Sequence, residues 1–250
     1  MRRVVITAAL LAAAALLAPA AASAAPVGGA RLVACQSALD PDARLVVFEG
    51  RMRIARGAAR MQMRFTLQTR TAGERRWHAL RAPGFGRWLT SDTGVGRYVY
   101  TKRLVSLLAP ASYRTIVRFR WLAADGRRLG GDRDTSPACR QRDLRADLRP
   151  RGVEARAGGD AFRARYVVPV ANRGHTAAGP FDVVVSVAGM TLAPVRAPGL
   201  AAGETALVQV EGPWCSEGQM LTVDVDPTGA VDERSEADNR LSVPCPGAPW

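Results

Sequence analysis

The sequence predicts an all-β protein in which two sandwich domains follow an N-terminal export signal. Apolar and polar residues alternate along many short segments, Gly and Pro separate these segments, and no segment of useful length has the helical period. The charge also changes abruptly: residues 31–140 hold 22 basic and 8 acidic residues, a net charge of +14, whereas residues 141–250 hold 11 and 14, a net charge of −3. Such a shift indicates a domain boundary near residues 141–147. We therefore expect one domain over residues 30–140 and a second over residues 147–245.

The first 24 residues are typical of a secretory signal peptide. Arg2 and Arg3 form a short positive region, an apolar run follows, and Ala22-Ser23-Ala24 is a small-residue cleavage site. The apolar run is short for a membrane span and is broken by Pro19, and no later segment is apolar enough to cross a bilayer. We expect a mature chain that is secreted or associated with the cell envelope, with no transmembrane segment once the signal is removed.

An even number of cysteines in an exported chain favours disulfides over metal or redox chemistry. The four are Cys35, Cys139, Cys215 and Cys245. Three pairings are open, and we expect 35–139 and 215–245 because each then closes within one domain. The stretch before Cys35 has the residue types of a lipoprotein cleavage box. Arg31 and the Pro26–Gly29 break separate it from the apolar region, which favours the disulfide.

Alternation in the first half assigns each side chain to a face. Within residues 60–70 the inward set is Met61, Met63, Phe65 and Leu67, and the arginines at both ends and at position 64 point outward. Residues 113–122 put Tyr113, Val117, Phe119 and Trp121 inward, and residues 46–54 alternate in the same way.

Several predicted strands carry arginine on the solvent side. The outward set proposed as a basic plate is Arg51, Arg53, Arg64, Arg114, Arg118 and Arg120. If these strands share one sheet, the plate suits teichoic acid, lipopolysaccharide phosphate, acidic polysaccharide or extracellular DNA, through charge and bidentate contacts. The alternative is a solvated face whose polar positions are arginine because of a GC-rich genome, and the sequence leaves both open.

Residues 107–121 resemble the strand pair near the end of a fibronectin type III or immunoglobulin-like domain. In those domains a loop leads to a Tyr that opens a core strand, and Tyr113 is the matching residue here. The resemblance implies an immunoglobulin-like sandwich for residues 30–140. A Cys35–Cys139 bridge would join the first and last strands rather than take the usual position between the sheets.

The second half carries an ordered set of short motifs. Asp147-Leu148 opens it, Asn172-Arg173-Gly174 ends a strand, and Leu200 with Gly203 precedes another. The last block is Val225, Asp226, Val231, Glu233, Glu236, Asp238 and Asn239. This order resembles the CARDB family, the cell-adhesion-related domain of bacteria, with Asp238 in place of the first Asn of the usual pair. The resemblance implies a seven-stranded sandwich of immunoglobulin type in an exported bacterial protein with an adhesion or scaffold role.

No pattern in the chain predicts catalysis. Neither His78 nor His175 has metal-ligand spacing around it, and no nucleophile-elbow motif is present. The acidic stretch from Asp224 fails as an EF-hand, because Thr228 and Ser235 occupy positions that need acidic ligands. We interpret that stretch as a turn at residues 226–229. The side chains expected to bond to turn amides are Glu233, Glu236, Asp238 and Asn239. The expectation is therefore no catalytic residues, no metal and no cofactor.

Together these observations predict a non-enzymatic cell-surface or extracellular binding or adhesion module. Its partner would be an unidentified protein or an anionic polysaccharide or envelope polymer, and export argues against genomic nucleic acid. The alternative function is an accessory or inhibitory partner of an envelope enzyme.

Overall fold

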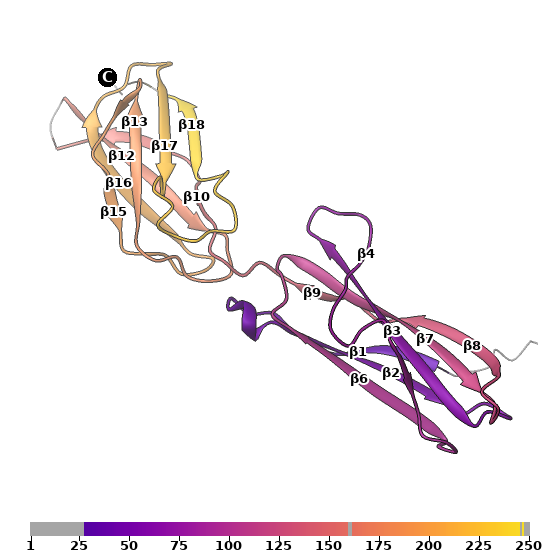
Figure 1. Ribbon diagram of the computed structural model, residues 1–250. Coiled ribbons are helices and arrows are strands. Elements are labelled where there is room, and N and C mark those ends of the chain that lie inside the picture. Colours follow the sequence, from indigo (N-terminus) through magenta and orange to yellow (C-terminus); the bar gives the residue numbers. More distant parts are fainter. Residues whose placement is uncertain (1–27, 160–161, 246, 248–250) are drawn as a thin grey trace, which may run out of the picture.

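Two β-sandwiches lie end to end, joined by a short segment around residue 142 (Figure 1). The structure is a computed structural model that describes residues 28–159, 162–245 and 247. Within these ranges the regular structure consists of β-strands and one 3-10 turn, η1 (Pro41–Ala43), and no sheet contains strands from both sandwiches. No helix in this part of the chain is long and apolar enough to cross a membrane. The predicted signal peptide, residues 1–24, lies outside the described residues.

The N-terminal sandwich is built from two antiparallel sheets. The first, the β2 sheet, has the order β1 (Gly28–Gln36), β2 (Leu45–Arg53), β6 (Arg97–Val105). The second, the β3–β7 sheet, pairs the long strands β3 (Arg60–Thr71) and β7 (Ala111–Leu122) at its centre. The strands β4 (His78–Ala79) and β5 (Trp88–Thr90) flank β3, and β8 (Arg128–Thr135) and β9 (Cys139–Gln141) flank β7.

The period-two pattern builds the core between these sheets. The inward side chains expected from the sequence are buried: Met61, Met63, Phe65, Leu67, Tyr113, Val117, Phe119 and Trp121. The β2 sheet supplies Val46, Phe48 and Met52 from the opposite side. Tyr113 donates its hydroxyl to the Leu108 carbonyl at 3.1 Å, near the start of β7. This is the tyrosine corner of immunoglobulin-like sandwiches.

The C-terminal sandwich also has two antiparallel sheets. In one, β12 (Arg163–Asn172) lies between β16 (Thr205–Pro213) and the pair β10 (Leu148–Pro150) and β11 (Glu154–Ala157). In the other, β13 (Phe181–Val187) lies between β17 (Met220–Val225) and the short strands β14 (Met190–Thr191) and β15 (Val195–Ala197). The strand β18 (Arg240–Pro244) pairs with β17 and forms the edge.

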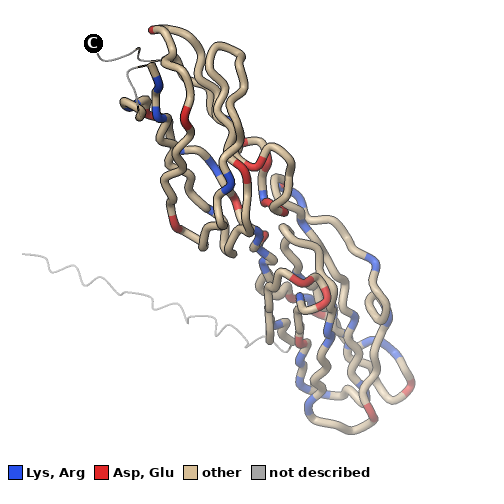
Figure 2. Tube along the Cα trace, turned by 90° about the vertical axis from the view of Figure 1, so that its left-hand side faces the viewer, with Lys and Arg blue, Asp and Glu red and all other residues tan. Residues whose placement is uncertain are grey.

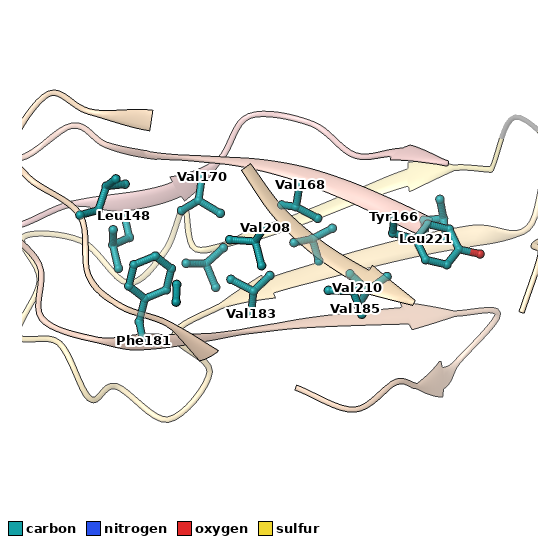
Figure 3. Close-up of a cluster of buried hydrophobic side chains, with 14 of the residues drawn as sticks. Leu148, Tyr166, Val168, Val170, Phe181, Val183, Val185, Val208, Val210 and Leu221 are labelled. Atoms are coloured by element: carbon teal, nitrogen blue, oxygen red, sulfur yellow. The ribbon is translucent and has the colours of Figure 1, made fainter. Parts of the chain in front are cut away.

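The core of this sandwich is mainly valine with a few larger side chains (Figure 3). Val168 and Val170 of β12 face Val183 and Val185 of β13, and Tyr166 and Phe181 fill the two ends (Figure 3). β-branched residues at alternating positions suit such half-buried strands, because their branched side chains pack well on the pleated surface.

Both expected disulfides are present. Cys35 of β1 bonds to Cys139 of β9, and Cys215, after β16, bonds to Cys245, after β18. The described residues contain no free cysteine. Each bridge stays within one sandwich, and the first joins the initial strand to the final one.

Candidate binding site: an arginine and tryptophan face

The outer face of the β3–β7 sheet carries nine of the 22 basic residues in residues 31–140. Figure 2 shows Lys and Arg positions recurring along the strands of the N-terminal sandwich. We call this surface the arginine–tryptophan face. It comprises Arg60, Arg64, Arg70, Arg114, Arg118, Arg120, Arg128, Arg133, Arg140, Trp77 and Trp88. The two-residue period of β3 and β7 places the arginines outward while the intervening side chains fill the core.

Strand register puts like charges side by side on this face. Arg64 of β3 lies opposite Arg118 of β7, and Arg118 lies opposite Arg133 of β8, so three guanidinium groups share one row. A second row at the end nearest the other sandwich places Arg70 and Arg140 on either side of Ser112. Like charges directly opposite each other in a sheet destabilise it. The first row therefore costs folding free energy in the isolated protein.

Two tryptophans order the arginines. The guanidinium carbons of Arg64 and Arg120 lie 5.0 and 3.8 Å from the ring centroid of Trp88, which is in β5. Those of Arg70 and Arg114 lie 4.8 and 4.2 Å from the centroid of Trp77, just before β4. Arginine stacks on aromatic rings through cation–π attraction. Each indole thus holds two cationic side chains on the sheet, which reduces the rotamer entropy that binding a ligand would cost.

None of the nine arginines has a carboxylate partner among the described residues, where every ion pair within 4.0 Å involves other cationic groups. The C-terminal sandwich and the segment before it differ. Ion pairs there involve Arg145, Arg149, Arg156, Arg163, Arg165, Arg196, Arg234 and Arg240. Burial, together with the charge of Arg70, lowers the pKa of Arg114. The nine guanidinium groups of the face are thus not compensated by ion pairs within 4.0 Å among the described residues.

A depression of about 540 Å³ lies at the centre of the face. Arg64, Arg118, Arg120 and Trp88 line it from β3, β7 and β5, and β8 contributes Arg128, Arg133 and one acidic residue, Asp132. Gly131 makes room for this arrangement, because a Cβ there would come within 2.2 Å of the Arg128 Nη2 atom. The Nε atom of Arg64 is buried and has no hydrogen-bond partner. A buried donor without a partner costs folding free energy.

The structure brings together four of the six predicted plate residues. Arg64, Arg114, Arg118 and Arg120 lie on the arginine–tryptophan face. Arg51 and Arg53 do not, because β2 belongs to the other sheet, where Arg51 lies opposite Gly29 and Val99. The single six-arginine plate is therefore wrong: side-chain period assigns a face to each strand, but it does not say which strands share a sheet.

Sequence reasoning missed both tryptophans and the β8 arginines. Trp77 and Trp88 lie in a Gly- and Pro-punctuated stretch without alternation, so no period assigned them to the sheet. Arg128 and Arg133 lie on a strand with two glycines and little apolar character. The alternation in β3 already placed Arg60 and Arg70 on the outward face, so the sequence could have assigned both to the candidate site.

The acidic stretch of the C-terminal sandwich is a structural loop. The carboxylate of Asp226, in the predicted turn, accepts the amides of Ala230 and Val231 at 3.0 and 2.8 Å. Glu233 instead reaches across the sandwich to the Leu148 amide and accepts the Asn239 side chain at 2.9 Å. The assignment of Glu236 and Asp238 to turn amides is wrong, since they contact the side chains of Asn239 and Arg149.

Burial raises the pKa of Glu233 to about 7, against the hydrogen bonds from Leu148 and Asn239 that lower it. The loop therefore ties the last strands to the start of the sandwich. In the described part of the chain, no group of three or more His, Cys, Asp and Glu side chains could hold a metal ion.

The fold and these contacts define an all-β chain of immunoglobulin-like sandwiches. Comparison with family models gives the more particular similarity: residues 145–243 match the CARDB family model. The CARDB match and the two disulfides fit an extracellular or cell-envelope location and a cell-surface, adhesion-like module. No curated protein matches the chain.

Solved structures include similar chains. A domain of a Methanosarcina acetivorans protein described as a cell surface protein is 22% identical, with 42% of this chain and 94% of that one covered and a TM-score of 0.37. The CARDB domain of a Pyrococcus furiosus protein, solved in complex with di-metal ions, is 19% identical over 42% and 94%, with a TM-score of 0.35. Red sea bream transglutaminase is 12% identical over 81% and 29%, with a TM-score of 0.28. At these TM-scores none of the three carries an inference about function.

Proposed function

We propose that this chain is an exported, non-enzymatic binding module that holds an anionic polymer of the cell envelope on its arginine–tryptophan face. The CARDB domain serves as the scaffold or adhesion unit that carries this face. One observation supports the proposal above the others: nine arginines share one sheet face without a carboxylate partner among the described residues.

The chemistry of the face suits repeated oxyanions. Guanidinium groups present planar forks of N–H donors that match carboxylate and phosphate oxygens. A bound oxyanion between Arg64, Arg118 and Arg133 would replace like-charge repulsion by attraction, so binding gains more than an isolated contact would give. The two tryptophans are engaged with arginine, which makes their main role the ordering of cations rather than stacking on a sugar.

The histidines do not support a catalytic alternative. His78 lies 3.7 Å from Glu74 at an exposed site in the N-terminal sandwich. His175 is exposed and lies in the C-terminal sandwich, within the group of residues that lines the junction between the two sandwiches. Neither is placed beside a nucleophile with a third orienting group, as a triad needs.

The test measures binding of the mature chain to two defined probes, an oligouronate and an oligomer of glycerol phosphate, over a range of salt concentrations. We expect binding to at least one, weakening steeply as salt rises because the contacts are exposed and charged. Replacement of Arg64, Arg118 and Arg120 by Gln should remove most of the affinity. The matched control replaces Arg51 and Arg53 by Gln on the other sheet and should change it little. Binding that persists in high salt, or equal losses in both variants, would overturn the proposal.

The two probes distinguish the two classes of anionic polymer. Preference for the uronate indicates an acidic polysaccharide, and preference for the glycerol phosphate indicates a teichoic-type polymer. The alternative role, as a partner of an envelope enzyme, gains support only if neither probe binds and a single purified envelope enzyme does.

A further inference from the structure

The arginine–tryptophan face ends at a groove between the two sandwiches. The groove has a volume of about 610 Å³ and a lining drawn from both sides. Arg70, Ser112 and Arg140 of the β3–β7 sheet form one wall, Arg142 lies in the connecting segment, and His175 and Arg234 belong to the opposite wall. The row of Arg70, Ser112 and Arg140 is thus shared by the face and by the groove.

The carboxylates of the groove are already engaged. Asp143 accepts hydrogen bonds from Arg145 at 2.8 and 3.1 Å, and these bonds lower the pKa of Asp143 and raise that of Arg145. Glu74 accepts the Thr71 amide at 2.9 Å, which lowers its pKa. Arg140 and Arg142 are exposed, and no ion pair involves either of them among the described residues. Arg140 and Arg142 therefore offer positive charge without an ion-pair partner among the described residues, whereas the charge of Asp143 is compensated by Arg145.

Both walls are held close to Arg142. On one side β9 pairs with β7 and is bonded to β1 through Cys139. On the other side the connecting segment is fixed to the C-terminal sandwich: Thr176 donates to the Leu144 carbonyl at 2.9 Å, and the Arg234 amide donates to the Ala146 carbonyl at 2.8 Å. The residues left between these two sets of contacts are Arg142 and Asp143, so the groove keeps its shape unless the chain turns at these two positions.

We propose that the groove is a second anion subsite and that a linear anionic polymer bound on the face continues into it, contacting both sandwiches. This inference rests on the proposed function. The row of Arg118, which is the nearest row of the central depression, and the row of Ser112 are six residues apart along β7, which is about 20 Å at ~3.3 Å per residue. A polymer must exceed this length to contact the central depression and the groove together.

The experiment compares two lengths of whichever probe binds the face, one shorter than that span and one at least twice as long. In the unmodified chain the long oligomer should bind about tenfold more tightly. The double variant Arg140→Gln/Arg142→Gln should lose that tenfold gain, about 1.4 kcal/mol, and should bind the short oligomer as the unmodified chain does. Unchanged binding of the short oligomer also shows that the variant is folded. Arg51→Gln/Arg53→Gln is the matched control and should retain the length dependence.

The outcomes separate the two proposals. If the short oligomer binds and depends on Arg118, while the long oligomer gains nothing or the groove variant keeps the gain, the second subsite is overturned and the proposed function stands. If neither length binds, both are overturned. If the control variant loses the length dependence as fully as the groove variant does, the effect is one of net charge and the subsite is overturned.

Discussion

Replacement of Arg118 by Gln should stabilise the protein and weaken its binding to anionic polymers. Arg118 is exposed at the centre of β7, with Arg64 directly opposite on one side and Arg133 on the other. In the free protein this position contributes repulsion from two neighbours. With a polymer bound, the same position contributes attraction. A residue that serves only the fold would not have opposite effects on the stability of the free protein and on its affinity for the polymer.

The magnitude follows from the two cross-strand pairs. Like charges opposite each other each cost roughly 0.2–1 kcal/mol, so removing one charge relieves about 1 kcal/mol in total. For a domain of this size a gain of about 1 kcal/mol raises the Tm by roughly 4–8 °C. Charge-assisted hydrogen bonds contribute about 1.5–3 kcal/mol, so the affinity for a polymer probe should fall about tenfold or more.

Thermal unfolding at low and high salt, with binding to the same probe, tests both effects. The gain in Tm should disappear near 1 M salt, where the screening length is about 3 Å. Arg51→Gln is the control, because its cross-strand neighbours are Gly29 and Val99 and it has no cationic partner to relieve. The reasoning fails if Arg118→Gln lowers the Tm at low salt, if its gain survives in high salt, or if the affinity does not change.

Three further outcomes are expected. Trp88→Ala removes the ring that holds Arg64 and Arg120. Polymer affinity should therefore fall about fivefold to thirtyfold, at ~0.5–1 kcal/mol for each of the two contacts, although the net charge is unchanged; equal affinity would contradict the ordering role. Burial raises the pKa of Glu233 to about 7 from 4.5, so the folded state binds its proton more tightly than the unfolded state does. The resulting stability is complete below about pH 4.5 and is lost as pH rises through 7. In urea unfolding of the C-terminal sandwich, Glu233→Gln should remove this loss of unfolding free energy, which is of the order of 3 kcal/mol. An unchanged pH profile would show that Glu233 does not cause the loss. Replacing the Cys35–Cys139 pair by Ala should lower the unfolding free energy of the N-terminal sandwich by about 2–5 kcal/mol and leave the unfolding of the C-terminal sandwich in place, and a shared loss would refute the independence of the two units.

Local pattern determined much of this molecule in advance. The two-residue period of a strand follows from backbone geometry alone, so Met61, Phe65 and Phe119 could be assigned to the core and Arg64 and Arg118 to the surface from their positions. The ordered motifs of residues 147–239 carried the CARDB resemblance, since turns demand particular residues at particular spacings. The cysteine pairing followed from the requirement that each bridge close within one unit.

Only the tertiary structure decided which strands share a sheet, and that decided the site. Arg53 and Arg64 have the same outward period, yet β2 and β3 belong to different sheets. Partner choice and register depend on contacts between residues far apart in the chain, which no local period contains. The alignment of Arg64, Arg118 and Arg133 in one row arises from that register, and Trp88 reaches the row from a segment without any repeating pattern. The sequence therefore determined that arginines face the solvent, and long-range pairing determined which of them act together.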